Sequence, residues 1–371
     1  MDYRKKTYKD AGVAKSVASK AMTTILALML ALVLTLSLTS CSTGSGSASV
    51  DVTTTSAQAE DNAASKSEMF TDRDLSGDYD ESEAVAITLN GTSAEAASAD
   101  GISTDGSTVT ITKEGVYIVS GTLSDGQIIV DADDSAKVQI VLKNASITSS
   151  TSAALYVKSA DKVFVTLADG TENTLANGGS FTADGDTNVD GAVFAKDDIT
   201  FNGNGSLTVT SPAGHGIVGK DDVKFAGGTY IITAAKHGVQ ANDSVRLAES
   251  DVTITSGDGK DGIHVSDDAD EEEGTESDSF FYMADGSLTV TAGDDGIHGT
   301  TVVQIDGGTF TISAAEGIEA TVIQINDGTV DIEASDDGIN GSQKSAALSV
   351  RVEINGGDIT INMGDRKSTR L

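Results

Sequence analysis

The sequence predicts an all-β solenoid, in which short strands wind into the coils of a parallel β-helix. Glycine accounts for 40 of the 371 residues, whereas the chain has one proline, no tryptophan and only 4% aromatic residues. Apolar and polar residues alternate in short runs, as they do in strands with one buried face. The same short stretch of sequence also recurs at a nearly constant interval, which is typical of a solenoid.

The first 40 residues (1–40) have the features of a lipoprotein signal peptide. A basic leader from Arg4 to Lys20 precedes the apolar run Ile25–Leu38, which is long enough for a signal peptide and short for a membrane span. The run ends in LTSC, which resembles a bacterial lipobox with Cys41 as the acylated residue. A plain signal peptide with an incidental cysteine is the alternative. We expect a lipid anchor at the extracellular face of the bacterial cell membrane.

Three further segments follow the signal peptide. Residues 41–68 lack apolar periodicity, which predicts a flexible tether between the membrane and the folded domain. Residues 69–364 alternate without a helical period of useful length and are expected to form one β-helix domain. Residues 365–371, DRKSTRL, break the repeat, and their back-translation resembles a sequencing adapter. We therefore expect a non-natural tail and a truncated last coil.

The internal repeat is anchored on glycines that each precede an apolar residue. Each repeat contains three short apolar runs, which suit three strands and three turns in a coil of about 21–25 residues. Leucine-rich repeats and propeller blades match this pattern less well. Gly307-Gly308 and Gly356-Gly357 suit tight corners with positive φ. The anchors are spaced by 25, 22, 24, 34, 21 and 21 residues: Gly191, Gly216, Gly238, Gly262, Gly296, Gly317 and Gly338.

The alternation also predicts which side chains fill the core, because stacked coils place equivalent residues on one another. The 34-residue spacing reflects an acidic insertion, Ser266–Ser279, which is a candidate binding loop or simply a solvated one. The expected core residues of two successive coils are Ile297, Val303, Ile305, Phe310 and Ile312, followed by Ile318, Ile323, Ile325, Val330 and Ile332.

Two columns of polar residues flank the anchor glycines. The column before the glycine is Asp190, His215, His237, Asp261, Asp295, Glu316 and Asp337. The column two residues after it is Val193, Val218, Gln240, His264, His298, Glu319 and Asn340. Asp294 and Asp336 add carboxylates one residue upstream of the first column.

Carboxylates in such columns would lie about 4.8 Å apart, the spacing of strands in a sheet. Like charges at this distance repel by on the order of 1 kcal/mol per pair in water, and a hard divalent cation would remove the repulsion. Calcium (Ca²⁺) accepts many oxygen ligands in irregular geometry, whereas zinc fits less well because no second cysteine is available and the histidines lie among oxygens. Acids that merely project into water at turns, or a pH-tuned carboxylate pair, are the alternatives.

The lipobox, the Ser/Thr-rich tether and the repeated DDGIH and INGGxxTI stretches resemble those of a family of clostridial surface proteins. These are the calcium-binding, polysaccharide-lyase-like β-helix carbohydrate-binding proteins, and the similarity spans roughly Tyr79 to Gly364. It implies a right-handed β-helix that binds calcium and plant cell-wall polysaccharides such as cellulose and polygalacturonate, the polymer of pectin. Glu316 and Glu319 share the columns and are expected to be further metal ligands, although they depart from the Asp/His pattern of the family. Positions that match the family's calcium ligands are Asp261, Asp294, Asp295, Asp336 and Asp337.

The expected function is therefore binding of an acidic or cellulosic polysaccharide through calcium, without catalysis and with no catalytic or sugar-contacting residue assigned. A calcium-dependent pectate lyase-like enzyme is the first alternative, with Lys236 or Lys260 as its base. A structural adhesin or spacer is the second. The formal charge of −33 makes a nucleic-acid partner very unfavourable.

Overall fold

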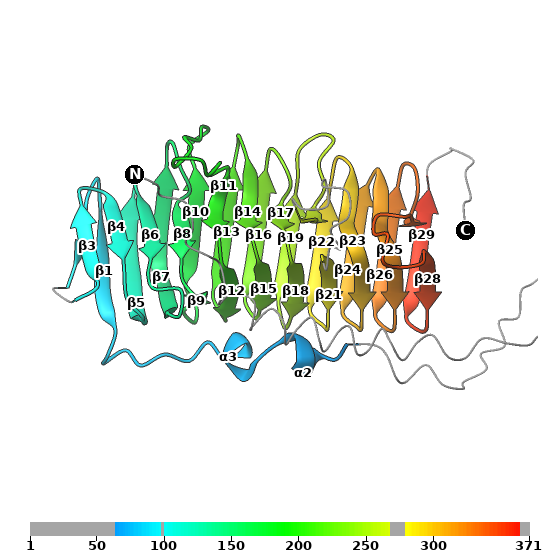
Figure 1. Cartoon of the computed structure of the whole chain (residues 1–371), viewed down its shortest axis with the longest axis horizontal. Helices are drawn as coiled ribbons and strands as arrows, with labels where there is room; N and C mark the ends of the chain where they lie inside the picture. The colour runs from blue at the N-terminus through cyan, green and yellow to red at the C-terminus, as the bar shows by residue number, and fades with distance from the viewer. Residues whose placement is uncertain (1–63, 98–99, 268–278, 364–371) are drawn as a thin grey trace, which may run out of the picture. The chain divides into compact units, whose positions relative to one another are not determined.

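The computed structural model describes residues 64–97, 100–267 and 279–363. Over these residues the chain is all-β, as predicted, with its strands joined in one mixed sheet (Figure 1). The described helices, α2 (Lys66–Met69) and α3 (Asp72–Leu75), have four residues each. No helix among the described residues has the length and apolarity needed to cross a membrane.

Several predicted segments lie outside the described residues. They are the signal peptide (1–40), the lipidation site Cys41, the tether as far as residue 63, most of the acidic insertion and the tail (365–371). The domain boundaries stay predictions. Within the described residues, α2 occupies the end of the stretch expected as a tether.

The N-terminal part of the sheet contains the two antiparallel pairs of strands, β1 with β2 and β3 with β4, whereas the other pairings between named strands are parallel. The bounds of these first strands are β1 (Val85–Gly91), β2 (Ala94–Ala96), β3 (Ile102–Asp105), β4 (Thr108–Ile111), β5 (Gly115–Leu123), β6 (Gln127–Asp131), β7 (Lys137–Ser149), β8 (Leu155–Ser159), β9 (Lys162–Leu167) and β10 (Glu172–Asn177).

The remaining strands continue the sheet to the end of the described chain. Their bounds are β11 (Gly191–Ala195), β12 (Asp198–Gly203), β13 (Ser206–Ser211), β14 (His215–Gly219), β15 (Asp222–Ala226), β16 (Thr229–Ala234), β17 (Val239–Ala241), β18 (Ser244–Ala248), β19 (Asp251–Thr255), β20 (Ile263–Val265), β21 (Phe280–Met283), β22 (Ser287–Thr291), β23 (Asp295–Ile305), β24 (Thr309–Ala314), β25 (Glu316–Ile325), β26 (Thr329–Ala334), β27 (Ile339–Gly341), β28 (Arg351–Ile354) and β29 (Asp358–Met363).

Three parallel ladders run through these strands. One contains β8, β11, β14, β17 and β20, the second β9, β12, β15, β18 and β21, and the third β10, β13, β16, β19 and β22. The long strands β23 and β25 each belong to the first and second ladders together. One coil therefore consists of three consecutive strand segments, as the three apolar runs of each repeat predict.

The predicted core is confirmed. Ile297 pairs with Ile318, Val303 with Ile323, and Phe310 with Val330, so that like residues stack on one another. All ten residues expected to face the interior are buried. Aromatic rings continue the core toward the N-terminus, where Phe201 and Phe225 stack with their centroids 5.3 Å apart. The alternation of the sequence is thus the alternation between core and solvent.

One predicted register is wrong by one residue. Val193 was aligned with Val218, but Val193 pairs with Ile217 and Phe194 pairs with Val218. Phe194 packs with Val218 and Tyr156 in a small cluster separate from the main core. The apolar contacts of Phe194 therefore set the register, rather than the spacing of the anchor glycines.

The corners predicted at paired glycines are also confirmed. Gly308 has φ of +90° and Gly357 has φ of +89°, a backbone region that side chains with a Cβ rarely enter. These turns let the chain pass from a strand of the second ladder to the next strand of the third ladder within a few residues.

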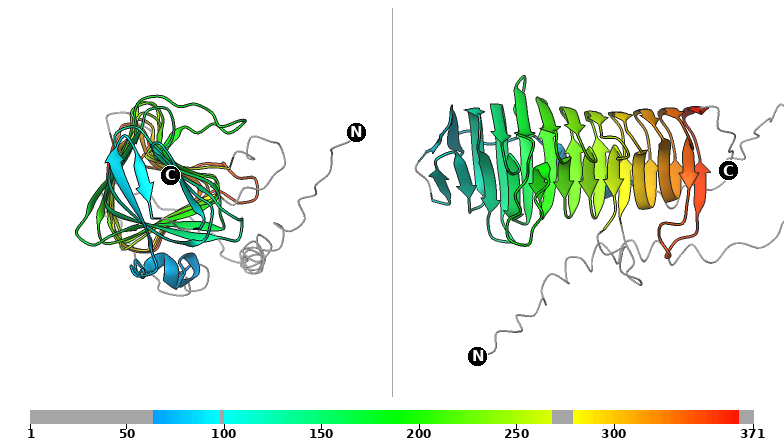
Figure 2. Two further views of the ribbon diagram at one scale, coloured as in Figure 1. Left: turned by 90° about the vertical axis from the view of Figure 1, so that its left-hand side faces the viewer. Right: turned by 90° about the horizontal axis from the view of Figure 1, so that it is seen from above.

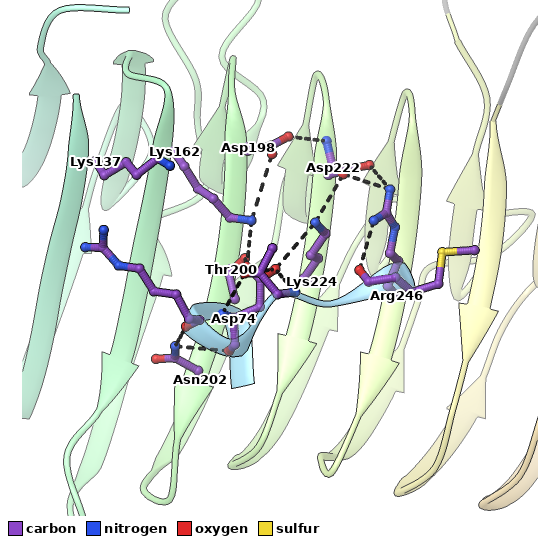
Figure 3. Close-up of polar contacts among 12 residues, drawn as sticks. Asp74, Lys137, Lys162, Asp198, Thr200, Asn202, Asp222, Lys224 and Arg246 are labelled. Atoms are coloured by element: carbon purple, nitrogen blue, oxygen red, sulfur yellow. Dashed lines mark hydrogen bonds and ion pairs between the residues drawn. The ribbon is translucent and has the colours of Figure 1, made fainter. Parts of the chain in front are cut away.

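Residues 64–76, here called the N-terminal strap, lie across the second ladder. In the end-on view of Figure 2, α2 and α3 lie against one outer side of the stacked strands. The Asp74 carboxylate is buried between Lys162 of β9 and Lys224 of β15, at 2.6 and 3.8 Å (Figure 3). Arg246 of β18 donates to the Met69 carbonyl, and Gln304 of β23 donates to the Ala64 carbonyl. The strap is thus fastened to several coils.

Candidate functional site

The column two residues after the anchor glycines lies on the first ladder. Gln240 pairs with His264, His264 with His298, His298 with Glu319, and Glu319 with Asn340. This alignment is the predicted one. The coils approach closely here, since a Cβ on Gly296 would meet Ile312 and would lie 2.6 Å from the Gly317 carbonyl oxygen. Glycine before the column therefore lets neighbouring coils stack at strand spacing.

The four histidines of the chain form one stack, here called the histidine stack. The ring centroids of His215 and His237 are 5.2 Å apart, those of His237 and His264 are 4.6 Å apart, and those of His264 and His298 are 4.8 Å apart. The stack changes column between His237 and His264. Sequence analysis placed each histidine in its column, but the contact across the two columns depends on side-chain direction.

The carboxylates of the first column contact this stack. Asp261 Oδ2 lies 2.6 Å from His264 Nδ1 and 3.4 Å from His237 Nδ1. Asp295 Oδ2 lies 2.9 Å from His298 Nδ1, which is also 3.2 Å from Glu319 Oε2. The backbone N–H of Asp295 donates to Asp261 Oδ1 at 3.1 Å and thereby holds that carboxylate in place.

Three groups of described residues could each hold a metal ion, with ligand atoms within 4.8 Å of one another. They bring together four of the seven predicted ligands, and they also include histidines that were not assigned as ligands. The groups are His237, Asp261 and His264; Asp261, Asp295 and His298; and Asp295, Glu316 and Glu319.

The other three predicted ligands lie outside these groups. Asp294 and Asp336 are exposed, and Asp337 is half-buried. Burial is the main cause that raises the pKa of the Glu316 carboxyl. The charges of Asp337 and Asp336 raise this pKa further, so both residues lie close to Glu316. They therefore add negative potential beside Glu316.

Charge is distributed unevenly along the site. Burial, reinforced by Asp261 and Glu319, raises the pKa of Asp295 to about 6. Burial would also raise the pKa of Glu319, but hydrogen bonds from His298, Lys344 and Ser342 lower it to about 2. Glu319 therefore keeps its negative charge to a lower pH than Asp295 does.

The histidines differ in the same way. Burial lowers the pKa of His237 to about 3, so this imidazole is neutral at pH 7. Burial opposes the charge of His298 too, but hydrogen bonds to Asp295 and Glu319 outweigh it and raise the pKa to about 9. The stack thus begins neutral and ends with a cation paired to carboxylates.

Asp295, Glu316 and Glu319, here called the oxygen site, fit the chemistry of calcium because all three offer carboxylate oxygens. Sequence analysis missed Lys344, which lies 2.8 Å from Glu319 Oε2. It belongs to a short insertion after Gly341, residues 342–348 (SQKSAAL). It is the only cationic residue of that insertion, and this charge beside an acidic column was the signal that the sequence offered. Asn340 donates to Glu316 and Glu319 at 2.9 and 3.1 Å.

A cavity of about 720 Å³ opens at the other end of the histidine stack. Its lining includes Lys196, Lys220, His215 and Gln240. Lys236, one of the two residues considered as a catalytic base, forms an ion pair with Asp190 at 2.7 Å. The lining also includes Asp186, Asp190 and Asp221, so the cavity brings lysine and aspartate side chains together.

The second candidate base, Lys260, directly precedes Asp261, a member of two of the candidate metal groups. Its side chain is half-buried, and its carbonyl accepts hydrogen bonds from the N–H groups of Gly293 and Asp294. The backbone of this residue thus links two successive coils.

Comparison with known proteins gives consistent matches. A family model described as carbohydrate-binding domain-containing protein matches residues 105–368. A carbohydrate-binding domain-containing protein of Acetivibrio thermocellus is 40% identical over 137 residues, which are 36% of this chain and 48% of that protein. The chain thus matches about half the length of this curated relative.

A similar fold occurs among solved structures. The polysaccharide lyase-like protein from C. thermocellum, solved as a gadolinium derivative, superposes with a TM-score of 0.59 at 31% identity. The match covers 67% of this chain and 96% of that one.

Proposed function

The chain belongs to the carbohydrate-binding domain-containing family, and from this we propose that it binds plant cell-wall polysaccharide through calcium, without catalysis. Polygalacturonate or cellulose is the proposed polymer. The observation that carries this proposal is the convergence of Asp295, Glu316 and Glu319 within 4.8 Å. Three carboxylates at this spacing repel one another, and a cation relieves the repulsion.

In this proposal the oxygen site holds the first calcium ion. Asp261 extends the site because it forms a second candidate group with Asp295. Asp336 and Asp337 add negative charge beside Glu316, and Asp294 adds a carboxylate directly before Asp295. Bound calcium would supply a Lewis-acidic contact for the carboxylates and hydroxyls of a sugar.

The chain's own residues would position the polymer. Lys196 in the cavity offers a cationic donor for a uronate carboxylate beside Asp186, Asp190 and Asp221, and Gln240 offers an amide for sugar hydroxyls. His215 lines the same cavity and begins the histidine stack, which leads toward the oxygen site. An acidic polysaccharide laid along the first ladder would meet first the cationic side chain of the cavity and then the calcium ion of the oxygen site.

The proposal includes two further points about the fold and the location of the protein. We propose that the coils form a right-handed parallel β-helix. We also propose that Cys41 carries a lipid that holds the protein at the extracellular face of the membrane. Metabolic labelling with a fatty acid tests the second point. Label on the wild-type protein that disappears in Cys41→Ser would support the anchor, and equal labelling of both would contradict it.

The binding proposal is tested by co-sedimentation of the purified protein with polygalacturonate and with cellulose, in calcium and in chelator. We expect retention in calcium, loss in chelator and weaker retention of Glu316→Gln. Glu333→Gln, which changes an exposed glutamate of β26, is the matched control. Retention that survives chelation would contradict the role of calcium. Absence of retention on both polymers would contradict binding altogether and favour the adhesin or spacer.

The same preparations distinguish the lyase alternative. Ultraviolet absorbance of unsaturated products from polygalacturonate should stay flat. Turnover that disappears in Lys260→Ala would overturn the non-catalytic proposal.

A further inference from the structure

We propose that His237, Asp261 and His264, here called the nitrogen site, bind a borderline divalent transition-metal ion of the Zn²⁺ type. This site lies on the same columns as the oxygen site but uses different donor atoms. It goes beyond polysaccharide binding, because nothing in that function needs a nitrogen ligand.

The first argument is convergence. The Nδ1 atoms of His237 and His264 come from neighbouring coils and both face Asp261 Oδ2, at 3.4 and 2.6 Å. The three ligand atoms lie within 4.8 Å of one another. Two imidazoles with one carboxylate form a common protein ligand set for zinc, with bond lengths of about 2.0–2.2 Å and a fourth position open to water. Small side-chain rotations would bring the three atoms onto one ion.

The second argument concerns protonation. The backbone N–H of Asp261 donates to His237 Nδ1 at 2.9 Å, so this nitrogen carries a lone pair instead of a proton. Metal binding would exchange that hydrogen bond for a metal–nitrogen bond. His264 Nδ1 lies at hydrogen-bonding distance from Asp261 and would release any proton that it carries there, as metal-binding histidines do.

The third argument is the support around the ligands. Asp261 Oδ1 accepts the backbone N–H of Asp295, which leaves Oδ2 directed at the imidazoles. Such outer hydrogen bonds orient metal-binding side chains. His215 stacks on His237, and its buried Nδ1 has no hydrogen-bond partner within the described part of the chain. A buried nitrogen without a hydrogen-bond partner among the described residues therefore lies one ring away from the proposed ion.

The donor atoms exclude calcium from this position. Calcium takes about six to eight oxygen ligands, and the nitrogen site offers a single carboxylate. Imidazole nitrogen instead favours zinc, nickel and copper. The donor atoms thus change from the nitrogens of His237 and His264 to the carboxylate oxygens of Asp295, Glu316 and Glu319.

The test uses Co²⁺ as a visible probe of zinc-type sites and Tb³⁺ luminescence as a probe of calcium-type sites. The full chain carries Cys41→Ser throughout, which removes its only thiol, and no histidine tag. We expect a visible Co²⁺ absorption band that Zn²⁺ abolishes by competition. His237→Asn and His264→Asn should each weaken Co²⁺ binding by roughly tenfold or more, while Tb³⁺ binding is retained.

Glu319→Gln provides the opposite control. It should weaken Tb³⁺ binding and leave the Co²⁺ band unchanged. Co²⁺ binding that survives both histidine substitutions would overturn the nitrogen site. An equal loss of Co²⁺ in Glu319→Gln would also overturn it, because attraction by the acidic columns as a whole would then explain the binding.

A measurement on the chain with all four histidines guards against variants that fail to fold. Nitrogen NMR of ¹⁵N-labelled histidine should show the signals of two imidazoles move on addition of Zn²⁺, with those of His298 unchanged. Movement of all four signals together, or of none, would contradict the proposal. Retention on polysaccharide in calcium alone is scored separately, so failure of either proposal leaves the other standing.

Discussion

Asp74 of α3 and Lys162 of β9 form a buried ion pair, with Nζ 2.6 Å from Oδ1. Thr200 of β12 donates to the same carboxylate oxygen at 2.9 Å. The other carboxylate oxygen accepts from Thr71 within the strap, also at 2.9 Å. One side chain therefore joins the N-terminal strap to successive coils of the second ladder.

Asp74→Asn should destabilise the protein because it removes the charge that Lys162 and Lys224 share. Loss of one partner from a buried ion pair costs about 3 kcal/mol or more. The expected result is a lower urea midpoint at pH 7. Asp72→Asn, in the same helix but exposed, is the control and should leave the midpoint unchanged.

The effect of Asp74→Asn should depend on pH in a defined direction. Burial would raise the pKa of Asp74, but Lys224, Lys162 and the Thr71 backbone hold it well below its usual value. A carboxyl whose pKa falls on folding stabilises the protein above its unfolded pKa, and this contribution disappears as the pH falls through the folded pKa. The difference in unfolding free energy between wild type and variant should therefore be full at pH 7 and smaller near about pH 3. A constant difference across this range would contradict the ion pair.

Phe225→Ala should open a cavity in the core. Phe225 is fully buried and stacks on Phe201, and truncation of a buried phenylalanine typically costs about 3–5 kcal/mol. Ile231→Ala is the comparison, because Ile231 is 50% exposed and such a change usually stays within about 0.5 kcal/mol. Thermal unfolding followed by circular dichroism measures both, and equal losses would argue against the assigned core.

Gly296→Ala and Gly259→Ala should destabilise the protein for different reasons, the first through steric overlap with the neighbouring coil and the second through its backbone conformation. A Cβ at Gly296 would meet Ile312 and the Gly317 carbonyl, and overpacking of this kind costs about 3 kcal/mol. Gly259 has φ of +62° with nothing within 4 Å, so only the backbone penalty of about 1 kcal/mol applies. The first variant should therefore unfold at the lower denaturant concentration. The reverse order would contradict the close stacking of coils beside the site.

Asp295→Asn should weaken calcium binding by roughly tenfold or more, in line with the loss of a metal-site group. Asp294→Asn should have a much smaller effect, because Asp294 is exposed and lies outside the groups of ligands. Calorimetric titration with calcium compares these two adjacent carboxylates directly. Equal effects would show that general negative charge, rather than the oxygen site, attracts the ion.

The columns could be read from the sequence because a parallel solenoid turns a constant spacing into spatial neighbours. Four glycine anchors with spacings of 24, 34 and 21 residues align His264, His298 and Glu319 correctly, since the extra residues lie in the insertion. The register failed at Val193, where the packing of Phe194 decides the pairing.

Other features were missed. Helices of four residues are too short to show apolar periodicity, and the signals that the sequence offered for α2 and α3 were the capping boxes Ser65–Glu68 and Thr71–Asp74. The partners of Asp74 lie on distant repeats, and no local pattern links them. The histidine stack likewise depends on His237 and His264 reaching across two columns, which the spacing alone does not specify.

In a solenoid each repeat touches only its neighbours, so stability normally spreads along the stack one interface at a time. The N-terminal strap adds a longitudinal brace, because it contacts β9, β12, β15, β18 and β23 independently of the strand ladders. Opening any of these coils must also release the brace. The central coils should therefore exchange their amide hydrogens as one cooperative unit, while the described strands that follow β23, which the strap does not contact, exchange earlier.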